Sequence, residues 1–208
     1  MGLLMNGLHN YLISLLEDKR ENILLEMEAY AKNRGFPIVG PLVGHFLMQY
    51  TQMIRARRIL ELGSGFGYSA VWFAKGKTNA EIICTDRSED NKNIALSYFR
   101  RLRLENIRFI VGDALEIIQQ LEGKFDIIFC DIDKKSYPKA FKIATPRLKL
   151  GGLLITDNTL WKGRILESKP STVSTKGVQD FNKLAFSDPN VISTIVPIGD
   201  GICVSLKI

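Results

Sequence analysis

The segment Ile59-Leu60-Glu61-Leu62-Gly63-Ser64-Gly65-Phe66-Gly67-Tyr68-Ser69 decides the fold of this 208-residue chain. A short apolar run contains an acid near its end, three alternating glycines follow, and a mostly apolar segment then begins at Ser69. This order predicts a strand, a tight turn that needs residues without Cβ, and a helix over 69–75 whose N-terminus faces the turn. A ligand can therefore approach the backbone of the turn closely.

The glycine spacing excludes two common phosphate-binding turns. The dinucleotide motif Gly-x-Gly-x-x-Gly would require glycine at position 68, where Tyr68 stands, and the phosphate-loop motif is absent as well. Glu61 would repel a pyrophosphate, whereas it suits a ligand that carries an amine or another cation. S-adenosylmethionine has a sulfonium and an amine but no phosphate. We therefore predict it as the cofactor over Gly63, Gly65 and Gly67, the alternative being a glycine-rich turn without a ligand.

Strand-like and helical segments alternate along the rest of the chain. The predicted helices are 3–17, 20–34, 41–54, 69–75, 89–103, 115–121 and 137–148. The predicted strands are 58–62, 80–85, 108–111, 125–130, 153–156, 191–198 and 202–208, the last two joined by Gly199-Asp200-Gly201 as a hairpin.

The alternation predicts an α/β fold of the Rossmann-like type. Its sheet is expected to have seven strands that are mostly parallel, a C-terminal antiparallel hairpin, and helices on both faces. We expect one domain over 1–208, with N-terminal helices in 1–54 and the core in 55–208. The polar, aperiodic segment between Trp161 and Gly177 follows a strand end, and we interpret it as a mobile flap over the site.

Five predicted strands end in acids or amides, and in an open parallel sheet ligands bind outside these ends. Asp86 lies about 20 residues beyond the glycine turn, where such folds bind a ribose. Asp113 and Ala114 follow the next strand and are predicted to meet the adenine. The alternatives are that Asp86 caps a helix and that Asp113 is a turn residue.

Asp131, Asp157 and Asn158 offer oxygen ligands from the ends of two strands. This donor set, with no histidine or cysteine beside it, favours Mg²⁺, Ca²⁺ or Mn²⁺ over zinc. Lys134 stands three residues after Asp131, and a lysine beside a divalent cation can act as a general base. The alternatives are acids that end strands without a metal and a surface lysine.

The composition bounds the class of protein and its surroundings. The net charge is +6 and the pI about 9.2, with arginines gathered at 55–58 and 100–108. These clusters predict either a solvated surface or attraction of an anionic substrate such as a coenzyme A thioester or RNA. The three cysteines match no metal or disulfide pattern, and no segment has the pattern of a signal peptide or a membrane helix. We therefore expect a cytoplasmic protein that does not bind membranes.

Five segments carry a family likeness: 59–69, Gly112-Asp113-Ala114, 124–134, 151–163 and 197–201. On these segments the sequence resembles the cation-dependent O-methyltransferases of the caffeoyl-coenzyme A and catechol type, over about residues 36–208. The resemblance implies their methyltransferase fold and a homodimer. Two departures are Ile132, where the family usually has alanine, and Leu42, where it often has glutamate.

The resemblance also implies the roles of individual residues. It implies S-adenosylmethionine contacts at Val39, Glu61, Gly63, Ser64, Ser69, Asp86, Ala114 and Asp133. It implies metal ligands at Asp131, Asp157 and Asn158 and a catalytic base at Lys134, so that Asp131 and Lys134 carry the chemistry. The expected reaction is metal-dependent O-methylation of a catechol or caffeoyl-type hydroxyl. The alternatives are methylation of a 5-hydroxyuridine in transfer RNA and binding of S-adenosylmethionine without catalysis.

Overall fold

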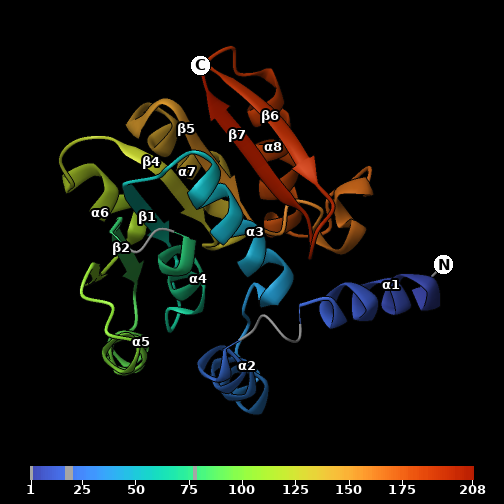
Figure 1. Cartoon of the computed structure of the whole chain (residues 1–208). Helices are drawn as coiled ribbons and strands as arrows, with labels where there is room; N and C mark the ends of the chain where they lie inside the picture. The colour runs from blue at the N-terminus through green and yellow to red at the C-terminus, as the bar shows by residue number, and fades with distance from the viewer. Residues whose placement is uncertain (1, 17–20, 77–78) are drawn as a thin grey trace.

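The computed structural model describes residues 2–16, 21–76 and 79–208, and a seven-stranded sheet lies at its centre (Figure 1). The strands are β1 (Arg58–Leu62), β2 (Glu81–Asp86), β3 (Ile107–Val111), β4 (Phe125–Cys130), β5 (Leu148–Thr156), β6 (Val191–Val196) and β7 (Ile202–Lys207). Their order is β3-β2-β1-β4-β5-β7-β6. β1 to β5 pair in parallel, whereas β7 is antiparallel to both β5 and β6. The predicted α/β fold with its C-terminal hairpin is confirmed.

Helices cover both faces of the sheet. They are α1 (Gly2–Ser14), α2 (Asn22–Arg34), α3 (Gly40–Met53), α4 (Tyr68–Gly76), α5 (Glu89–Arg101), α6 (Ala114–Gln120), α7 (Tyr137–Ala144) and α8 (Val173–Ser187). The described residues also include the short 3-10 helices η2 (Lys134–Ser136), η3 (Thr145–Arg147) and η4 (Trp161–Leu166). The predicted ends of the first two helices at residues 17 and 20 lie outside the described residues.

Alternation along β1 divides the core into two layers. Ile59 joins the cluster formed with α2, α3, α4 and α5, whereas Leu60 and Leu62 join the cluster formed with α6, α7 and α8. Successive side chains of a strand point to opposite faces, and so one apolar strand serves both layers. The central strands are thus packed between two layers of helices. Because β1 to β5 are parallel, their carboxyl ends all lie at one edge of the sheet.

Two predictions about secondary structure were wrong. The predicted helix 137–148 ends at Ala144, and Leu148 instead begins β5, which is longer than expected. Pro146 stands in the intervening η3 and has no N–H to continue the helix. The segment interpreted as an aperiodic flap, between Trp161 and Gly177, also contains the first turn of α8. The helical period of α8 becomes visible only further along, at its buried residues Val178, Phe181 and Ala185.

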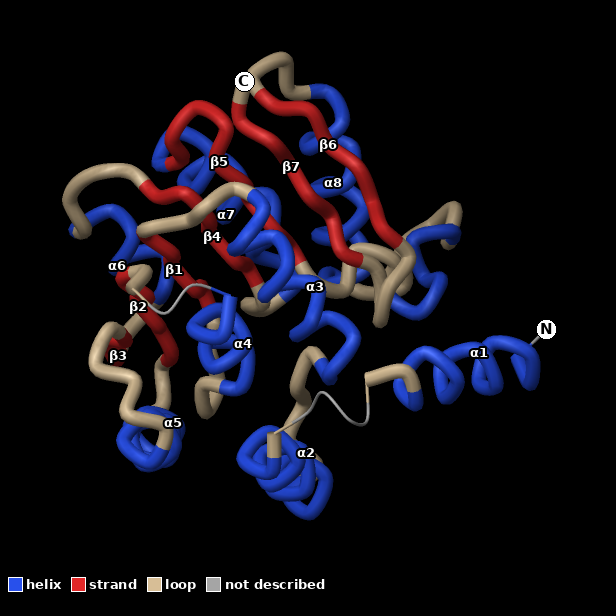
Figure 2. The backbone as a smooth tube through the Cα atoms, in the orientation of Figure 1, coloured by secondary structure: helices blue, strands red, loops and turns tan. Residues whose placement is uncertain are grey.

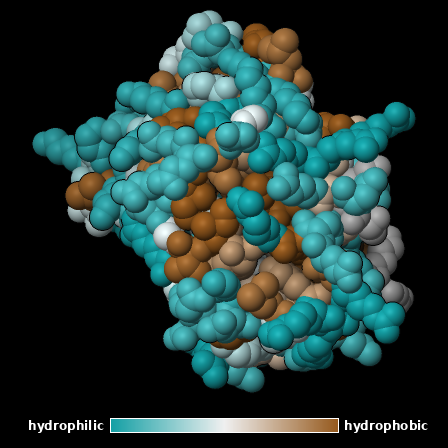
Figure 3. Space-filling model, turned by 90° about the vertical axis from the view of Figure 1, so that its left-hand side faces the viewer, coloured by the Kyte–Doolittle hydropathy of each residue, from teal (hydrophilic) through white to brown (hydrophobic). Residues whose placement is uncertain are grey.

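Apolar residues reach the surface in more than one region of the described chain. Helix α1 projects from the body of the molecule (Figure 2), and its Leu8 and Tyr11 are exposed, as is Leu15 just after the helix. On the side of α5 and α6, apolar residues gather in the middle of the surface with hydrophilic residues around them (Figure 3). The edge strand β3 lies on that side. The homodimer stays a prediction.

Within the described residues no helix is both long and apolar enough to span a bilayer.

Candidate active site

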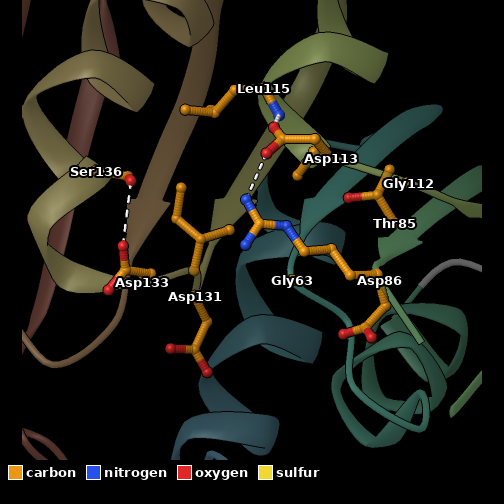
Figure 4. Close-up of a pocket in the computed structure, with 12 residues that line it drawn as sticks. Gly63, Thr85, Asp86, Gly112, Asp113, Leu115, Asp131, Asp133 and Ser136 are labelled. Carbon is orange, nitrogen blue, oxygen red and sulfur yellow. Dashed lines mark hydrogen bonds and ion pairs between the residues drawn. The ribbon is translucent and has the colours of Figure 1, made fainter.

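A cleft lies over the carboxyl ends of β1, β2 and β4. It consists of two adjacent cavities of about 260 and 140 Å³ that share Gly63, Asp86 and Asp131 as lining residues. The larger cavity also contains Asp113, Ala114 and Asp133 (Figure 4), and the smaller one contains Val39, Ser64, Gly65 and Ser69. Nine of the eleven predicted cofactor residues therefore meet in one place.

The remaining two predicted cofactor residues, Glu61 and Gly67, do not line the cleft. Gly67 has φ +86°, and a Cβ there would lie 2.6 Å from Cζ of Phe99. A glycine is needed at this position both for the conformation of the turn and for packing against α5. Gly63 has the same φ, and a Cβ there would lie 2.5 Å from the carbonyl oxygen of Asp131, so the turn and the end of β4 can approach only without a side chain.

Asp86 organises the turn rather than capping a helix. Its Oδ2 accepts from the N–H of Gly65 at 3.0 Å, and its Oδ1 accepts from the N–H of Ser88 and from Nδ2 of Asn91. Ser88, and not Asp86, is the N-cap of α5. The carboxylate therefore ties the glycine turn to the start of α5 while it faces both cavities.

Asp113 is the N-cap of α6, since its Oδ1 accepts from the N–H of Leu115 at 2.8 Å. Its Oδ2 pairs with the guanidinium of Arg87, another residue that lines the larger cavity. This hydrogen bond from Arg87 holds the pKa of Asp113 below its usual range. Arg87 lines the cleft, and sequence reasoning missed it because it looked like an ordinary residue after a strand.

The predicted base and metal ligands follow β4 and β5, which are neighbours in the sheet. Cys130 pairs with Thr156 in register, and so Asp131 and Asp157, the next residues, stand side by side. Nζ of Lys134 donates to Oδ1 of Asp131 at 2.6 Å. The arrangement brings two carboxylates and an amine together at one edge of the cleft.

The donor set fits a divalent cation. Burial and the nearby charge of Asp131 raise the pKa of Asp157 to about 7, because the two carboxylates repel each other. A cation bound between them would offset this repulsion. Asn158 has φ +55°, a conformation that asparagine tolerates better than most residues. Within the described residues no group of three or more His, Cys, Asp or Glu could hold a metal, and the candidate set is two acids and an amide.

Comparison with known proteins adds a family to this geometry. The sequence model of a family described as O-methyltransferase matches residues 15–208. The chain belongs to the O-methyltransferase family. The prediction of this family and of an S-adenosylmethionine-dependent enzyme is thereby confirmed.

Individual relatives agree with this membership. A catechol O-methyltransferase of Niastella koreensis is 29% identical over 195 residues, which cover 90% of this chain and 88% of that protein. Caffeoyl-CoA O-methyltransferase 1 of Eucalyptus globulus is 32% identical over 178 residues, which cover 79% of this chain and 72% of that protein. The crystal structure of the Bacillus cereus O-methyltransferase in complex with SAH has a TM-score of 0.87 at 27% identity, covering 97% of each chain.

Glu61 of this O-methyltransferase is fully buried beneath the turn. Sγ of Cys84 donates to its Oε2 at 3.4 Å, whereas its Oε1 has no hydrogen-bond partner among the described residues. Burial raises the pKa of Glu61 to about 7, and the neighbouring hydroxyls of Ser69 and Ser64 offset this only in part. An unpaired carboxylate oxygen under the glycine turn fits a cofactor that carries an amine.

Glu61→Gln is expected to change how stability depends on pH. The folded protein binds a proton at Glu61 up to about pH 7, whereas an unfolded glutamate releases it near 4.5. The Glu61 contribution to stability is thus fully present below pH 4.5 and is lost as the pH rises through 7, by about 3 kcal/mol.

The measurement is the free energy of unfolding of wild type and Glu61→Gln without ligand, by urea titration from pH 4.5 to 8. The difference between the two proteins should move in favour of Glu61→Gln as the pH rises. A difference that stays constant over this range would contradict the raised pKa. Glu89→Gln, an exposed glutamate at the start of α5, serves as the control.

The two arginine clusters lie away from the cleft. Arg58 begins β1 and Arg108 stands near the start of β3, so both are at the amino edge of the sheet. Arg58 pairs with Glu81 at 2.7 Å, and Arg101 forms two hydrogen bonds with Glu26. Arg58 and Arg101 therefore have local structural partners, and none of the clustered arginines lines the cleft.

Proposed function

We propose that this O-methyltransferase transfers the methyl group of S-adenosylmethionine to one hydroxyl of a vicinal aromatic diol, a catechol or caffeoyl-type acceptor, in a reaction that depends on a divalent cation. The observation that carries the proposal is the convergence of Lys134, Asp131 and Asp157 beside the cofactor cleft. The names of the relatives, catechol and caffeoyl-CoA O-methyltransferases, support the same acceptor class.

The chain's own residues account for the main steps. Asp131, Asp157 and Asn158 would hold the cation, Mg²⁺ being favoured by the all-oxygen donor set. When bound, the cation would lower the pKa of the acceptor hydroxyl and favour a neutral Lys134. Lys134 would accept the hydroxyl proton, the acceptor oxygen would form a bond to the methyl carbon, and the bond from that carbon to sulfur would break. The products are a methyl ether and S-adenosylhomocysteine.

The cleft would orient the two reactants. Asp86 and Asp133 line the cavity predicted for the adenosine, and Val39 and Ser69 line the one predicted for the methionine part. Asp131 lines both cavities, and this supports the proposal that the candidate base and cation ligands would lie next to the sulfonium. Holding two reactants in line supplies much of the rate in such displacements.

The test measures methyl transfer from labelled S-adenosylmethionine with Mg²⁺ and with a chelator. One acceptor set contains catechols and caffeoyl thioesters, and the other is transfer RNA that lacks methylation of its uridine hydroxyls. Metal-dependent label on the small molecules supports the proposal. Label on the RNA alone, with strong dependence on salt, would establish the transfer RNA alternative instead. Binding of S-adenosylmethionine without label on either would contradict both acceptor classes and leave the acceptor of this O-methyltransferase open.

A further inference from the structure

Helix α8 approaches the candidate base through a glycine. Gly177 is buried, and a Cβ there would lie 2.7 Å from Cα of Lys135, 3.0 Å from the carbonyl carbon of Lys134 and still closer to its carbonyl oxygen. Its φ is not in the left-handed region, so the backbone conformation does not require glycine. The requirement is the close contact between α8 and η2, the turn that carries Lys134.

Aromatic packing extends this contact to the candidate metal ligands. Phe181 of α8 packs edge-on against Tyr137, with ring centroids 5.6 Å apart. The hydroxyl of Tyr137 donates to the carbonyl oxygen of Asp157 at 2.9 Å, and Nζ of Lys134 lies 5.1 Å from the Tyr137 ring centroid. Tyr137 is fully buried, and so one rigid side chain joins α8, Lys134 and Asp157.

The same helix also binds the chain that follows β5. Nδ2 of Asn182 donates to the carbonyl oxygen of Thr159 at 2.8 Å. Nε2 of Gln179 donates to the carbonyl oxygens of Ile165 and Glu167 at 2.9 and 2.8 Å. Helix α8 is therefore attached to the segment after β4, which carries Lys134, and to the segment after β5, which carries Asp157 and Asn158.

We infer that α8 fixes the position of Lys134 relative to Asp131 and Asp157, and that Gly177 is a positioning residue of the methyl-transfer site. The inference rests on the proposed function, because it assigns to α8 the geometry on which proton transfer by Lys134 depends. The cofactor cleft has no α8 residue in its lining. Of the η2 residues, only Ser136 lines that cleft, and a change at the contact of α8 with η2 should therefore affect the chemical step much more than cofactor binding.

The deciding variant is Gly177→Ala. The added Cβ must displace η2 or α8 by roughly 1 Å, and a misplacement of that size is expected to lower kcat by about 10- to 100-fold. The Kd for S-adenosylmethionine, measured by calorimetry, should change much less than kcat, since Ser136 is the only η2 residue in the lining of the cleft. The KM for the acceptor should change much less than kcat.

A matched control is Gly76→Ala, at the end of α4. Its Cβ would lie 2.5 Å from the carbonyl oxygen of Met48, a comparable clash with the backbone of a neighbouring helix. Gly76 lies outside the lining of the cleft, and this variant should lose stability but keep kcat within about twofold of wild type. An equal loss of kcat in both variants would overturn the inference, as would a wild-type kcat in Gly177→Ala.

A crystal structure of Gly177→Ala gives a result that does not depend on activity. We expect Nζ of Lys134 to leave Oδ1 of Asp131, with which it forms a 2.6 Å contact in the wild type. An unmoved η2 would contradict the inference even if the wild type methylates none of the acceptors, a result that would count against the proposed function alone. If Gly177→Ala does not fold, Phe181→Leu is read by the same kinetic and structural criteria.

Discussion

Lys134→Ala is expected to lower kcat by about 10²- to 10⁴-fold, the range measured for removal of a general base. The Nζ of this residue contacts Asp131 at 2.6 Å, and its side chain is only 12% exposed, so the amine is held beside the candidate metal ligand. The Kd for S-adenosylmethionine should change little, because Lys134 does not line either cavity of the cleft.

The measurement is single-turnover methyl transfer at saturating cofactor, which separates the chemical step from binding and product release. Lys139→Ala is the matched control, since it removes an exposed lysine from α7 of the same segment. Activity of Lys134→Ala close to that of the wild type would show that another group takes the proton. A loss in both variants would point to instability of the segment.

Asp157→Asn is expected to lower metal-dependent activity by roughly 10²-fold or more, because a ligand that carries charge is replaced by a neutral one. Asp157 is 4% exposed and its Oδ1 accepts from the N–H of Asn158 at 2.7 Å, so no other carboxylate can take its place without a backbone change. The residual activity of the variant should be nearly insensitive to chelation. The wild-type activity should be lost in chelator and restored by Mg²⁺.

The stability of Asp157→Asn is not expected to fall with its activity. Because burial and Asp131 raise the pKa of Asp157 to about 7, its charge is disfavoured in the folded protein above that pH. In chelator at pH 8 we therefore expect the unfolding temperature of Asp157→Asn to equal or exceed that of the wild type. Calorimetric titration with Mn²⁺ completes the test, and Asp90→Asn, an exposed aspartate of α5, is the control. Equal metal affinity of Asp157→Asn and the wild type would contradict the ligand assignment.

The sequence alone determined the sheet, the order of its elements along the chain and the edge where the site lies. Apolar runs such as 125–130 and the glycine turn at 63–67 are local signals, because strand periodicity and the need for residues without Cβ act within a few neighbours. Acids at strand ends could be grouped from their positions in the chain, since parallel strands share one carboxyl edge. The side-by-side position of Asp131 and Asp157 follows from the same rule.

Only the tertiary structure decided what surrounds these residues. The burial of Glu61, the pairing of Arg87 with Asp113 and the distance of the arginine clusters from the cleft each depend on elements far apart in the chain. Gly177 looked like the end of a loop, yet it lies inside a helix whose buried face is set by η2 and Tyr137. Packing between distant segments has no local pattern, and for that reason the environment of each site residue could be learned only from the folded chain.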